Sequence, residues 1–369
     1  MRLAIVRRRY TPFGGAERFI EASAGAFAAA NIEVSIIAES WGGAPGSARH
    51  VSVPPGGITR AGRLAHFQRA VADVVARERF DLVQTHERLL TADIFRAGDG
   101  VHAAWVKRLA AERGAWRGAL MRLDPMHRLV IDTERRMARE SGMMFVANSG
   151  LVAREIVDWL SVPAARIRAI ENGVDLVRYR PPTPDERVAA RRSFNLGGDA
   201  PVVAFVGSGF ERKGAFKLIE ALALPAMYDM RAIVAGADRS LERLRARVAA
   251  LGIGDRVTIA GGVADPLAVY RAADLFVLPS LYDPMPNAAL EALACGLPVV
   301  TTTDAGIAEA VREAKAGALV SRDPDAIAAG ISAVIGVRAN MAAAALTLAQ
   351  RFDLKAATAR WLALYRELA

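Results

Sequence analysis

A short loop in the second half of the chain joins glycines to two adjacent cations. Its sequence is GSGFERKG over residues 207–214, between an apolar stretch at 202–207 and an amphipathic stretch at 215–223. Glycine lets the backbone approach a ligand closely. Two cations at the start of a helix are unfavourable unless an anion binds there. The alternative is a solvated basic loop, and the pattern favours an anion site formed by Arg212 and Lys213.

Two carboxylates lie close together in the block DPMPNAALEALACGLP over residues 283–298. Asp283 follows the apolar stretch 275–279, and Glu291 lies on the predicted helix that comes next. Each has a plain structural interpretation, Asp283 as an acid near a helix cap and Glu291 as an exposed helix acid. Together they can hold two sets of hydroxyl groups on one elongated ligand.

The first half of the chain has its own glycine-rich turn at Gly14 and Gly15. It follows the apolar stretch 2–6 and precedes an amphipathic stretch, where a helix N-terminus offers N–H groups to an anion. A tight strand-to-helix turn explains the two glycines equally well. The pattern is not G-x-G-x-x-G, which argues against a nicotinamide cofactor.

The elements that must position these loops are short apolar runs alternating with amphipathic stretches. This alternation predicts an α/β fold with two parallel sheets, each covered by helices on both faces. The predicted strands are 2–6, 33–38, 50–53, 81–85, 94–97 and 143–147 in the first half, and 202–207, 231–236, 257–260, 275–279 and 298–301 in the second.

The length of 369 residues favours two domains, at roughly 100–200 residues per domain. We expect an N-terminal domain at 1–170, a linker at 171–186 and a C-terminal domain at 187–350, followed by a helix at 351–369 that can pack back on the N-terminal domain. Ligands of such folds bind beyond the carboxyl ends of the strands. The expected site is therefore the cleft between the two domains.

Composition excludes several classes of protein. The single cysteine, Cys295, rules out an intrachain disulfide and a cysteine-rich zinc site. Hydrophobic residues make up 53% and charged residues 24%, so the chain can fill two cores and is not intrinsically disordered. The net charge is +9, and residues 1–180 hold 27 basic and 19 acidic side chains. A polyanionic partner is therefore expected at the N-terminal half.

Together, the three loops resemble the retaining family 4 glycosyltransferases, whose GT-B fold places two Rossmann-like domains across a cleft. The resemblance covers nearly the whole chain, includes the sequence ENGVD at 171–175, and is most specific in the block 283–298. Within the family, the chain most resembles the lipopolysaccharide glucosyltransferase I type. This implies a hexosyltransferase that moves a hexose, with glucose expected, from a UDP-sugar to a heptose of the lipopolysaccharide inner core.

The resemblance also implies roles for the candidate residues. Arg212 and Lys213 bind the diphosphate and stabilise it as it leaves, Asp283 holds hydroxyls of the sugar, and Glu291 binds the ribose. Asp99 faces the acceptor, with His102 as the rival group and a packing histidine as its alternative. The expected donor contacts are Gly14, Gly15, Ser208, Arg212, Lys213, Asp283, Met285, Asn287, Ala288 and Glu291, and the expected catalytic residues are Asp99, His102, Arg212, Lys213 and Asp283.

The chain departs from the family pattern in two ways. Asp283 stands where the family usually has Glu, and Pro284 and Pro286 stand where Gly is common, which removes N–H donors and leaves the transferred sugar open. No pair of carboxylates with the roles used by retaining glycosidases is evident, so we expect front-face attack with retention. No histidine cluster suggests a metal. We expect no cofactor, since the UDP-sugar is a substrate.

The stretch 103–139 holds nine basic residues against four acids, interleaved with Trp105 and Trp116. Such a stretch can lie on an anionic membrane, with a solvated helix face as the alternative. With a lipid-linked oligosaccharide acceptor, it implies a cytoplasmic protein, peripheral on the inner face of the plasma membrane. The alternatives are another retaining GT-B transferase with a different lipid-linked or soluble acceptor, a UDP-sugar epimerase and a nucleic-acid-binding protein. No nucleic acid is expected, because the aromatic residues fall on apparent helix faces.

Overall fold

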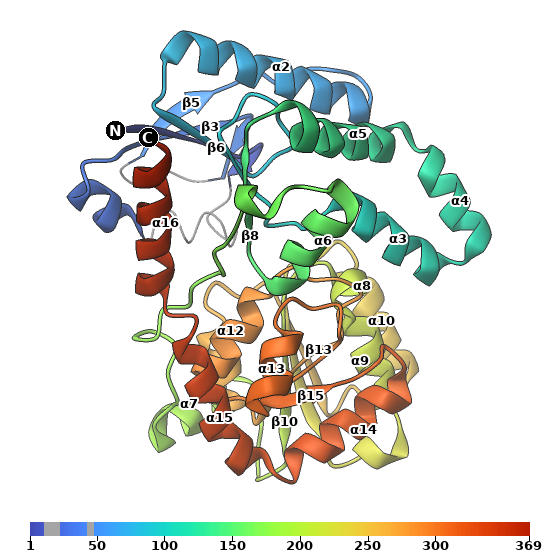
Figure 1. Ribbon diagram of the computed structural model, residues 1–369. Coiled ribbons are helices and arrows are strands. Elements are labelled where there is room, and N and C mark those ends of the chain that lie inside the picture. The colour runs from blue at the N-terminus through green and yellow to red at the C-terminus, as the bar shows by residue number, and fades with distance from the viewer. Residues whose placement is uncertain (11–22, 43–47) are drawn as a thin grey trace. The chain divides into compact units, whose positions relative to one another are not determined.

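The computed structural model describes residues 1–10, 23–42 and 48–369. Within these ranges the chain divides into two compact units (Figure 1). The N unit consists of residues 1–172 together with 355–369, and the C unit consists of residues 173–354. Gly14 and Gly15 lie outside the described residues.

The N unit is built on a seven-stranded sheet in which every neighbouring pair is parallel. The strand order is β5-β3-β1-β6-β7-β8-β9. Two further short strands, β2 (Arg9–Tyr10) and β4 (Ser40–Trp41), pair with each other. The strands of the main sheet are β1 (Arg2–Val6), β3 (Glu33–Ala38), β5 (Arg49–Ser52), β6 (Leu82–Thr85), β7 (Ile94–Arg96), β8 (Met144–Ala147) and β9 (Ile167–Ala169).

Three helices of the N unit begin at polar caps that the sequence supplies. The side chains of Thr59, Asp124 and Ser149 each accept a hydrogen bond from an N–H of the first turn of α2, α5 and α6 respectively. The last helix, α16, is held to the sheet of this unit by a hydrogen bond of 2.7 Å from the Tyr365 hydroxyl to Gln84 Oε1. The helices are α2 (Arg60–Glu78), α3 (His102–Arg113), α4 (Ala115–Leu123), α5 (Pro125–Glu140), α6 (Gly150–Leu160) and α16 (Leu354–Leu368).

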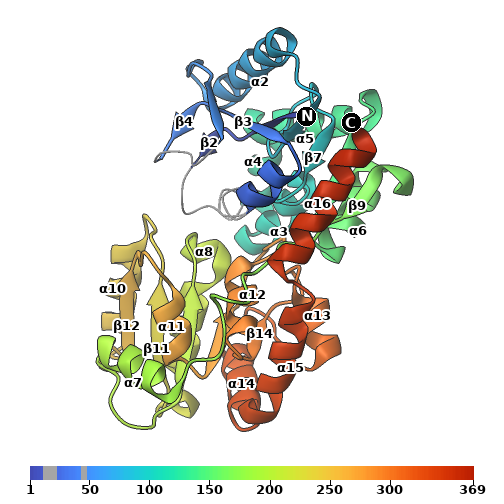
Figure 2. The same cartoon turned by 90° about the vertical axis from the view of Figure 1, so that its left-hand side faces the viewer.

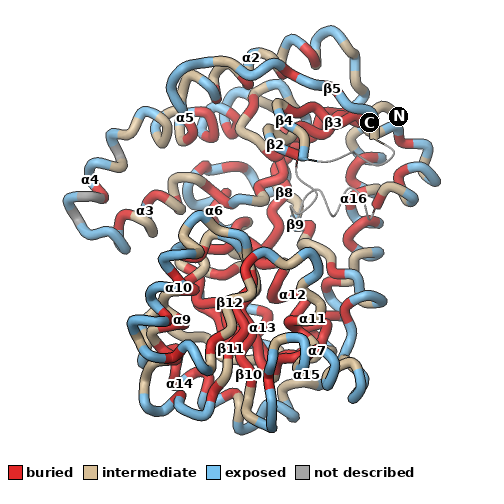
Figure 3. The backbone as a smooth tube through the Cα atoms, turned by 180° about the vertical axis from the view of Figure 1, so that it is seen from behind, coloured by how far each residue is buried: buried red, intermediate tan, exposed pale blue. Residues whose placement is uncertain are grey.

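The C unit has a six-stranded parallel sheet with the order β12-β11-β10-β13-β14-β15. Every residue of β13 is buried, on both faces of the strand, so helices cover both sides of the sheet. Figure 3 shows this buried core on the strands. The strands are β10 (Val202–Val206), β11 (Arg231–Ala235), β12 (Val257–Gly261), β13 (Leu275–Leu278), β14 (Val299–Thr301) and β15 (Gly317–Leu319).

The helices of the C unit surround this sheet (Figure 2). They are α7 (Pro184–Ser193), α8 (Phe210–Lys213), α9 (Ala215–Leu222), α10 (Leu241–Ala250), α11 (Leu267–Ala272), α12 (Asn287–Ala294), α13 (Ala308–Ala314), α14 (Pro324–Ile335) and α15 (Arg338–Gln350). Among the described residues, no single helix has the length and apolar composition needed to cross a bilayer, although the sharply bent pair of α14 and α15 passes that test when taken together.

The α/β class with two parallel, Rossmann-like sheets is confirmed. Three details differ from the expectations. Helix α7 begins at Pro184, inside the stretch 171–186 expected to be a linker, because Thr183 and Glu186 form a reciprocal capping box. Strands β9 and β15, of three residues each, were not predicted.

Candidate active site

The strand order of the C unit places two predicted loops beside each other. The order reverses between β10 and β13, which are adjacent and parallel, and their chain continuations therefore diverge at the carboxyl edge of the sheet. Such a point is where open α/β sheets form a ligand crevice. The basic loop at 207–214 follows β10, and the loop carrying Asp283 follows β13.

The basic loop needs glycine at two positions. A Cβ at Gly207 would lie 2.8 Å from Cδ of Lys213, so this glycine leaves room for the lysine stem. Gly214 has φ +84°, and a Cβ there would lie 2.2 Å from the carbonyl oxygen of Pro279. The basic loop therefore passes directly against the start of the loop after β13.

The two cations stand just before a helix, as expected. Arg212 and Lys213 end the four-residue helix α8 and directly precede α9, whose N-cap residue is Gly214. The N-terminus of α8 is already occupied, because Asp238 accepts hydrogen bonds from the N–H groups of Gly209 at 2.6 Å and Phe210 at 3.1 Å. The N–H groups of Gly209 and Phe210 are therefore already taken by a carboxylate of the protein itself.

The structure brings Arg212, Lys213 and Asp283 together. Lys213 Nζ lies 2.9 Å from Asp283 Oδ2, and Arg212 Nη1 lies 3.8 Å from the same oxygen. Asp283 is thus the carboxylate that faces both cations. Two cations against one carboxylate leave this cluster of three side chains with one net positive charge.

Hydrogen bonds to backbone carbonyls connect the two loops. Arg212 Nη1 donates to the carbonyl of Tyr282 at 2.7 Å, and the N–H of Leu281 donates to the carbonyl of Arg212 at 2.7 Å. Arg322 adds a clamp, donating to the carbonyls of Pro279 at 3.1 Å and Glu211 at 3.0 Å. Sequence reasoning missed Arg322 and Asp238. Arg322 follows the unpredicted strand β15, and the contacts of both residues depend on the strand order.

Helix α12 starts just after Asp283. Asp283 is buried and does not cap the helix, whose N-cap residue is Pro286. Glu291 is only 6% exposed, so it is not an exposed helix acid, and its Oε2 accepts a 2.8 Å hydrogen bond from the hydroxyl of Tyr270. Both plain interpretations of the carboxylates are therefore excluded.

The remaining donor candidates lie around the same edge of the sheet. Ser208 is exposed in the loop after β10. Met285 and Ala288 are buried, and Asn287 is half-buried as the first residue of α12. The first N–H groups of a helix have no partner within that helix, so the start of α12 presents backbone donors.

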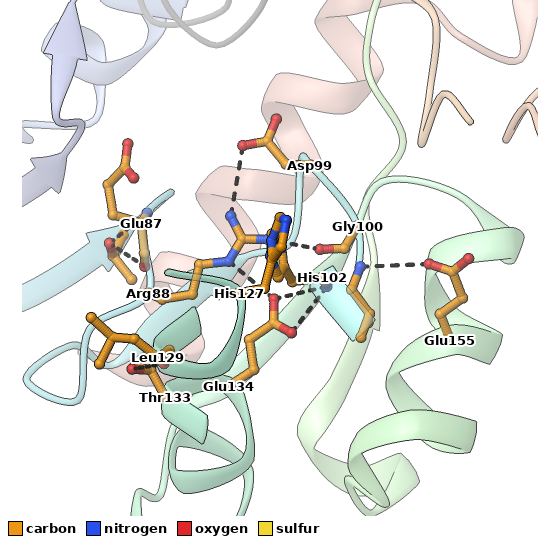
Figure 4. Close-up of polar contacts among 12 residues, drawn as sticks. Glu87, Arg88, Asp99, Gly100, His102, His127, Leu129, Thr133, Glu134 and Glu155 are labelled. Atoms are coloured by element: carbon orange, nitrogen blue, oxygen red, sulfur yellow. Dashed lines mark hydrogen bonds and ion pairs between the residues drawn. The ribbon is translucent and has the colours of Figure 1, made fainter. Parts of the chain in front are cut away.

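In the N unit, Asp99 and His102 lie three residues apart and differ in exposure. Asp99 follows β7 and is 65% exposed, with its Oδ2 3.8 Å from Arg88 Nη1. His102, the first residue of α3, is half-buried, and its Nε2 lies 2.9 Å from Nδ1 of His127 (Figure 4). Burial, reinforced by Arg88 and His127, lowers the pKa of His102 to about 3, so its ring is neutral near pH 7.

A buried acid supports both of these residues. Glu134, on α5, accepts from Arg88 Nε at 3.0 Å and from the backbone N–H of His102 at 3.0 Å. Arg88 also donates to the carbonyl of Gly100 at 3.0 Å, which fixes the turn between Asp99 and His102 (Figure 4). Sequence reasoning missed Arg88, His127 and Glu134, because only the tertiary structure brings them together.

No metal site is evident in the parts of the chain that the structure describes, where no three His, Cys, Asp or Glu side chains gather as ligands. Metal independence stays a prediction.

Comparison with known proteins gives the family. Residues 13–178 match the family described as Glycosyltransferase Family 4, and residues 186–345 match the family described as Glycosyl transferases group 1. The D-inositol 3-phosphate glycosyltransferase of Salinispora tropica is 34% identical, over 92% of this chain and 78% of that protein. The protein of the same name from Geodermatophilus obscurus is 34% identical, over 83% of this chain and 72% of that protein.

Solved structures agree on the fold. WaaG, a glycosyltransferase involved in lipopolysaccharide biosynthesis, has a TM-score of 0.87 at 24% identity, over 98% of this chain and 99% of WaaG. Anabaena HepE, solved with UDP-glucose, has a TM-score of 0.75 at 20% identity, over the full length of both chains. Both matches show the fold alone, whereas the family matches and the 34% identical relatives show that the chain belongs to the group 1, family 4 glycosyltransferases and is a hexosyltransferase of the GT-B fold.

Proposed function

We propose that this glycosyltransferase takes a hexose, with glucose as the first candidate, from a UDP-sugar and transfers it with retained configuration. The observation that carries the proposal is the cluster of Arg212, Lys213 and Asp283 at the carboxyl edge of β10 and β13. Its net positive charge suits a diphosphate, and its buried carboxylate suits sugar hydroxyls. The structure of HepE with UDP-glucose supports this class of donor.

Each residue of the cluster has a part in the proposal. Arg212 and Lys213 bind the diphosphate and stabilise the charge that develops on it as the glycosidic bond breaks. Asp283 accepts hydrogen bonds from the sugar, Glu291 accepts them from the ribose, and the start of α12 donates from Met285, Asn287 and Ala288. The proposed contact of Gly14 and Gly15 with the donor rests on the resemblance to the family alone.

The chemical step is a front-face displacement. The bond from the anomeric carbon to the diphosphate oxygen breaks, the bond to the acceptor oxygen forms on the same face, and the acceptor proton passes to the leaving diphosphate. The protein then supplies positioning and charge stabilisation, with no covalent intermediate. Lys213 and Arg212 do the work that a metal ion does in other transferases.

For the acceptor, we propose a heptose of the lipopolysaccharide inner core, held on its lipid. The overall fold is that of WaaG, and the exposed carboxylate of Asp99 is better placed to meet an acceptor hydroxyl than His102, whose ring is engaged by His127. The second candidate is a soluble inositol phosphate. It is favoured by the two 34% identical relatives, both named D-inositol 3-phosphate glycosyltransferase.

The membrane part of the proposal rests on helix α4. Trp116, Leu120 and Leu123 are 71%, 50% and 66% exposed. Their spacing places them on one face of the helix, which forms an outward apolar stripe within the basic stretch 103–139. Apolar side chains combined with basic ones suit the interface of an anionic membrane. We therefore place the enzyme in the cytoplasm, peripheral on the inner face of the plasma membrane.

A transfer assay by mass spectrometry tests the proposal. UDP-glucose, UDP-galactose and UDP-N-acetylglucosamine are each combined with deacylated inner-core lipopolysaccharide or with inositol 3-phosphate, and both UDP and the product are measured. We expect UDP-glucose and the heptose acceptor to give the fastest transfer with an α-linked product. Transfer to inositol phosphate alone would support the second acceptor, and a β-linked product would contradict retention.

A further inference from the structure

Tyr270 is a buried side chain for which the proposed chemistry has no role. It lies on α11, is fully buried, and donates its hydroxyl hydrogen to Glu291 Oε2 at 2.8 Å. Burial, followed by the nearby Glu291, raises the pKa of Tyr270 well above its usual value, so the hydroxyl remains a donor. Glu291 is itself almost wholly buried, so protein contacts and not solvent determine where its carboxylate points.

The ring of Tyr270 is held from two sides. Tyr179 packs edge-on against it, with ring centroids 6.1 Å apart, and Phe276 of β13 packs at a tilt, with centroids 6.0 Å apart. Aromatic pairs of this geometry restrict a ring beyond simple burial. The hydroxyl is therefore fixed in space before any ligand arrives, and it fixes one carboxylate oxygen of Glu291.

We propose that Tyr270 is a positioning residue for nucleotide recognition, which aims the Glu291 carboxylate at the ribose hydroxyls of the donor. This rests on the proposed role of Glu291. A carboxylate that accepts from two hydroxyls must have a defined orientation, because a hydrogen bond weakens steeply as its angle departs from linearity. Without the tyrosine hydroxyl, the carboxylate rotates or turns toward another donor, and the ribose contacts are lost first.

The test compares ligands as well as variants. Calorimetry measures the binding of UDP and of 2′,3′-dideoxy-UDP, which lacks both ribose hydroxyls, to the wild type, Tyr270→Phe, Glu291→Gln and the double variant. We expect Tyr270→Phe to weaken UDP binding about tenfold, or about 1.4 kcal/mol, and to leave the affinity for the analogue unchanged. The double variant should bind UDP no more weakly than Glu291→Gln alone, since the two residues act together.

A matched control removes a different buried tyrosine hydroxyl. Tyr365→Phe breaks the hydrogen bond to Gln84 in the N unit, and it should leave the binding of both ligands unchanged. Equal weakening of UDP and analogue in Tyr270→Phe would overturn the proposal, because it would show a general structural role. Unchanged UDP binding in that variant would overturn it as well.

Two outcomes separate this proposal from the proposed function. If the wild type binds UDP and the analogue equally, Glu291 does not read the ribose, and both fail. If discrimination is lost in Glu291→Gln but kept in Tyr270→Phe, only the role of Tyr270 fails. Should Tyr270→Phe not fold, 3-fluorotyrosine at position 270 keeps the hydroxyl. Its fluorine resonance is expected to shift with UDP and not with the analogue, and a resonance indifferent to UDP would overturn the proposal.

Discussion

Removing the charge of Lys213 tests the donor site most directly. The substitution is Lys213→Met, which keeps the apolar stem beside Gly207 and deletes the ammonium group. In the structure this ammonium lies 2.9 Å from Asp283 Oδ2, and the two side chains are 14% and 8% exposed. The variant therefore removes one of the two cations proposed to stabilise the departing diphosphate.

The effect on catalysis follows from the geometry of the cluster. Loss of one preorganised stabilising group costs about 100-fold or more in kcat, or about 2.7 kcal/mol. Arg212 remains, with its guanidinium 3.8 Å from Asp283, so some stabilisation of the leaving group persists. We expect kcat for UDP-sugar turnover to fall by at least 100-fold and KM to change much less, since the charge on the diphosphate is greatest in the transition state.

The same change has a cost in stability, which a second variant isolates. Breaking a buried ion pair by removing one partner costs about 3–5 kcal/mol, and we expect about 2 kcal/mol here because Arg212 still faces Asp283. Lys213→Met combined with Asp283→Asn removes both charges. It should recover most of the lost free energy of unfolding in urea titration but none of the lost activity.

A nearby lysine gives the control. Lys217 lies on α9 and pairs with Glu220 at 3.2 Å on the partly exposed surface of the helix. Lys217→Met should change kcat by less than twofold. The assay is steady-state UDP release, measured with the same donor and acceptor for all variants, and it compares their kcat with that of the wild type. Activity of Lys213→Met within threefold of the wild type would refute the assignment of the basic loop to the leaving group.

Three further predictions concern metal, pH and the membrane. Transfer should survive excess EDTA because the two cations of the basic loop supply the charge; a loss that Mg²⁺ or Mn²⁺ restores would contradict this. The pKa of His102 is about 3 in the folded protein and near 6.5 in the unfolded chain, so the unfolded state binds the proton preferentially and stability falls as the pH drops from about 6.5 toward 3, by up to about 1.4 kcal/mol per pH unit. His102→Asn should reduce this slope in urea unfolding at pH 7, 6 and 5, and an unchanged slope would show that the histidine does not titrate in this way. Wild-type protein should sediment with vesicles rich in phosphatidylglycerol and be released at about 0.5 M salt, because the attraction of basic side chains to an anionic surface is screened. Replacing Trp116, Leu120 and Leu123 together by Ser should weaken this binding, whereas Tyr228→Ser, at an exposed position of the C unit, should not; equal sedimentation of both variants would rule out α4 as the membrane face.

The sequence alone determined the fold class and the position of the important loops. Apolar runs such as 202–207 and 275–279 are too continuous for half-exposed strands, and their alternation with amphipathic stretches requires parallel sheets under helices. Glycines, cations and carboxylates placed directly after those runs lie at the carboxyl edge of a sheet in any such fold. Local pattern is therefore enough to locate Arg212, Lys213 and Asp283 at this edge.

Only the tertiary structure decided which partners these residues have. Strand order and the packing of α11 and α12 determine three contacts. Asp283 pairs with Lys213, Asp238 accepts from the N-terminus of α8, and Tyr270 donates to Glu291. The same holds for the contact of His102 with His127, which joins two helices of the N unit. Such contacts join residues far apart in the chain, and the periodicity of a local stretch records which face is buried but not what it is buried against.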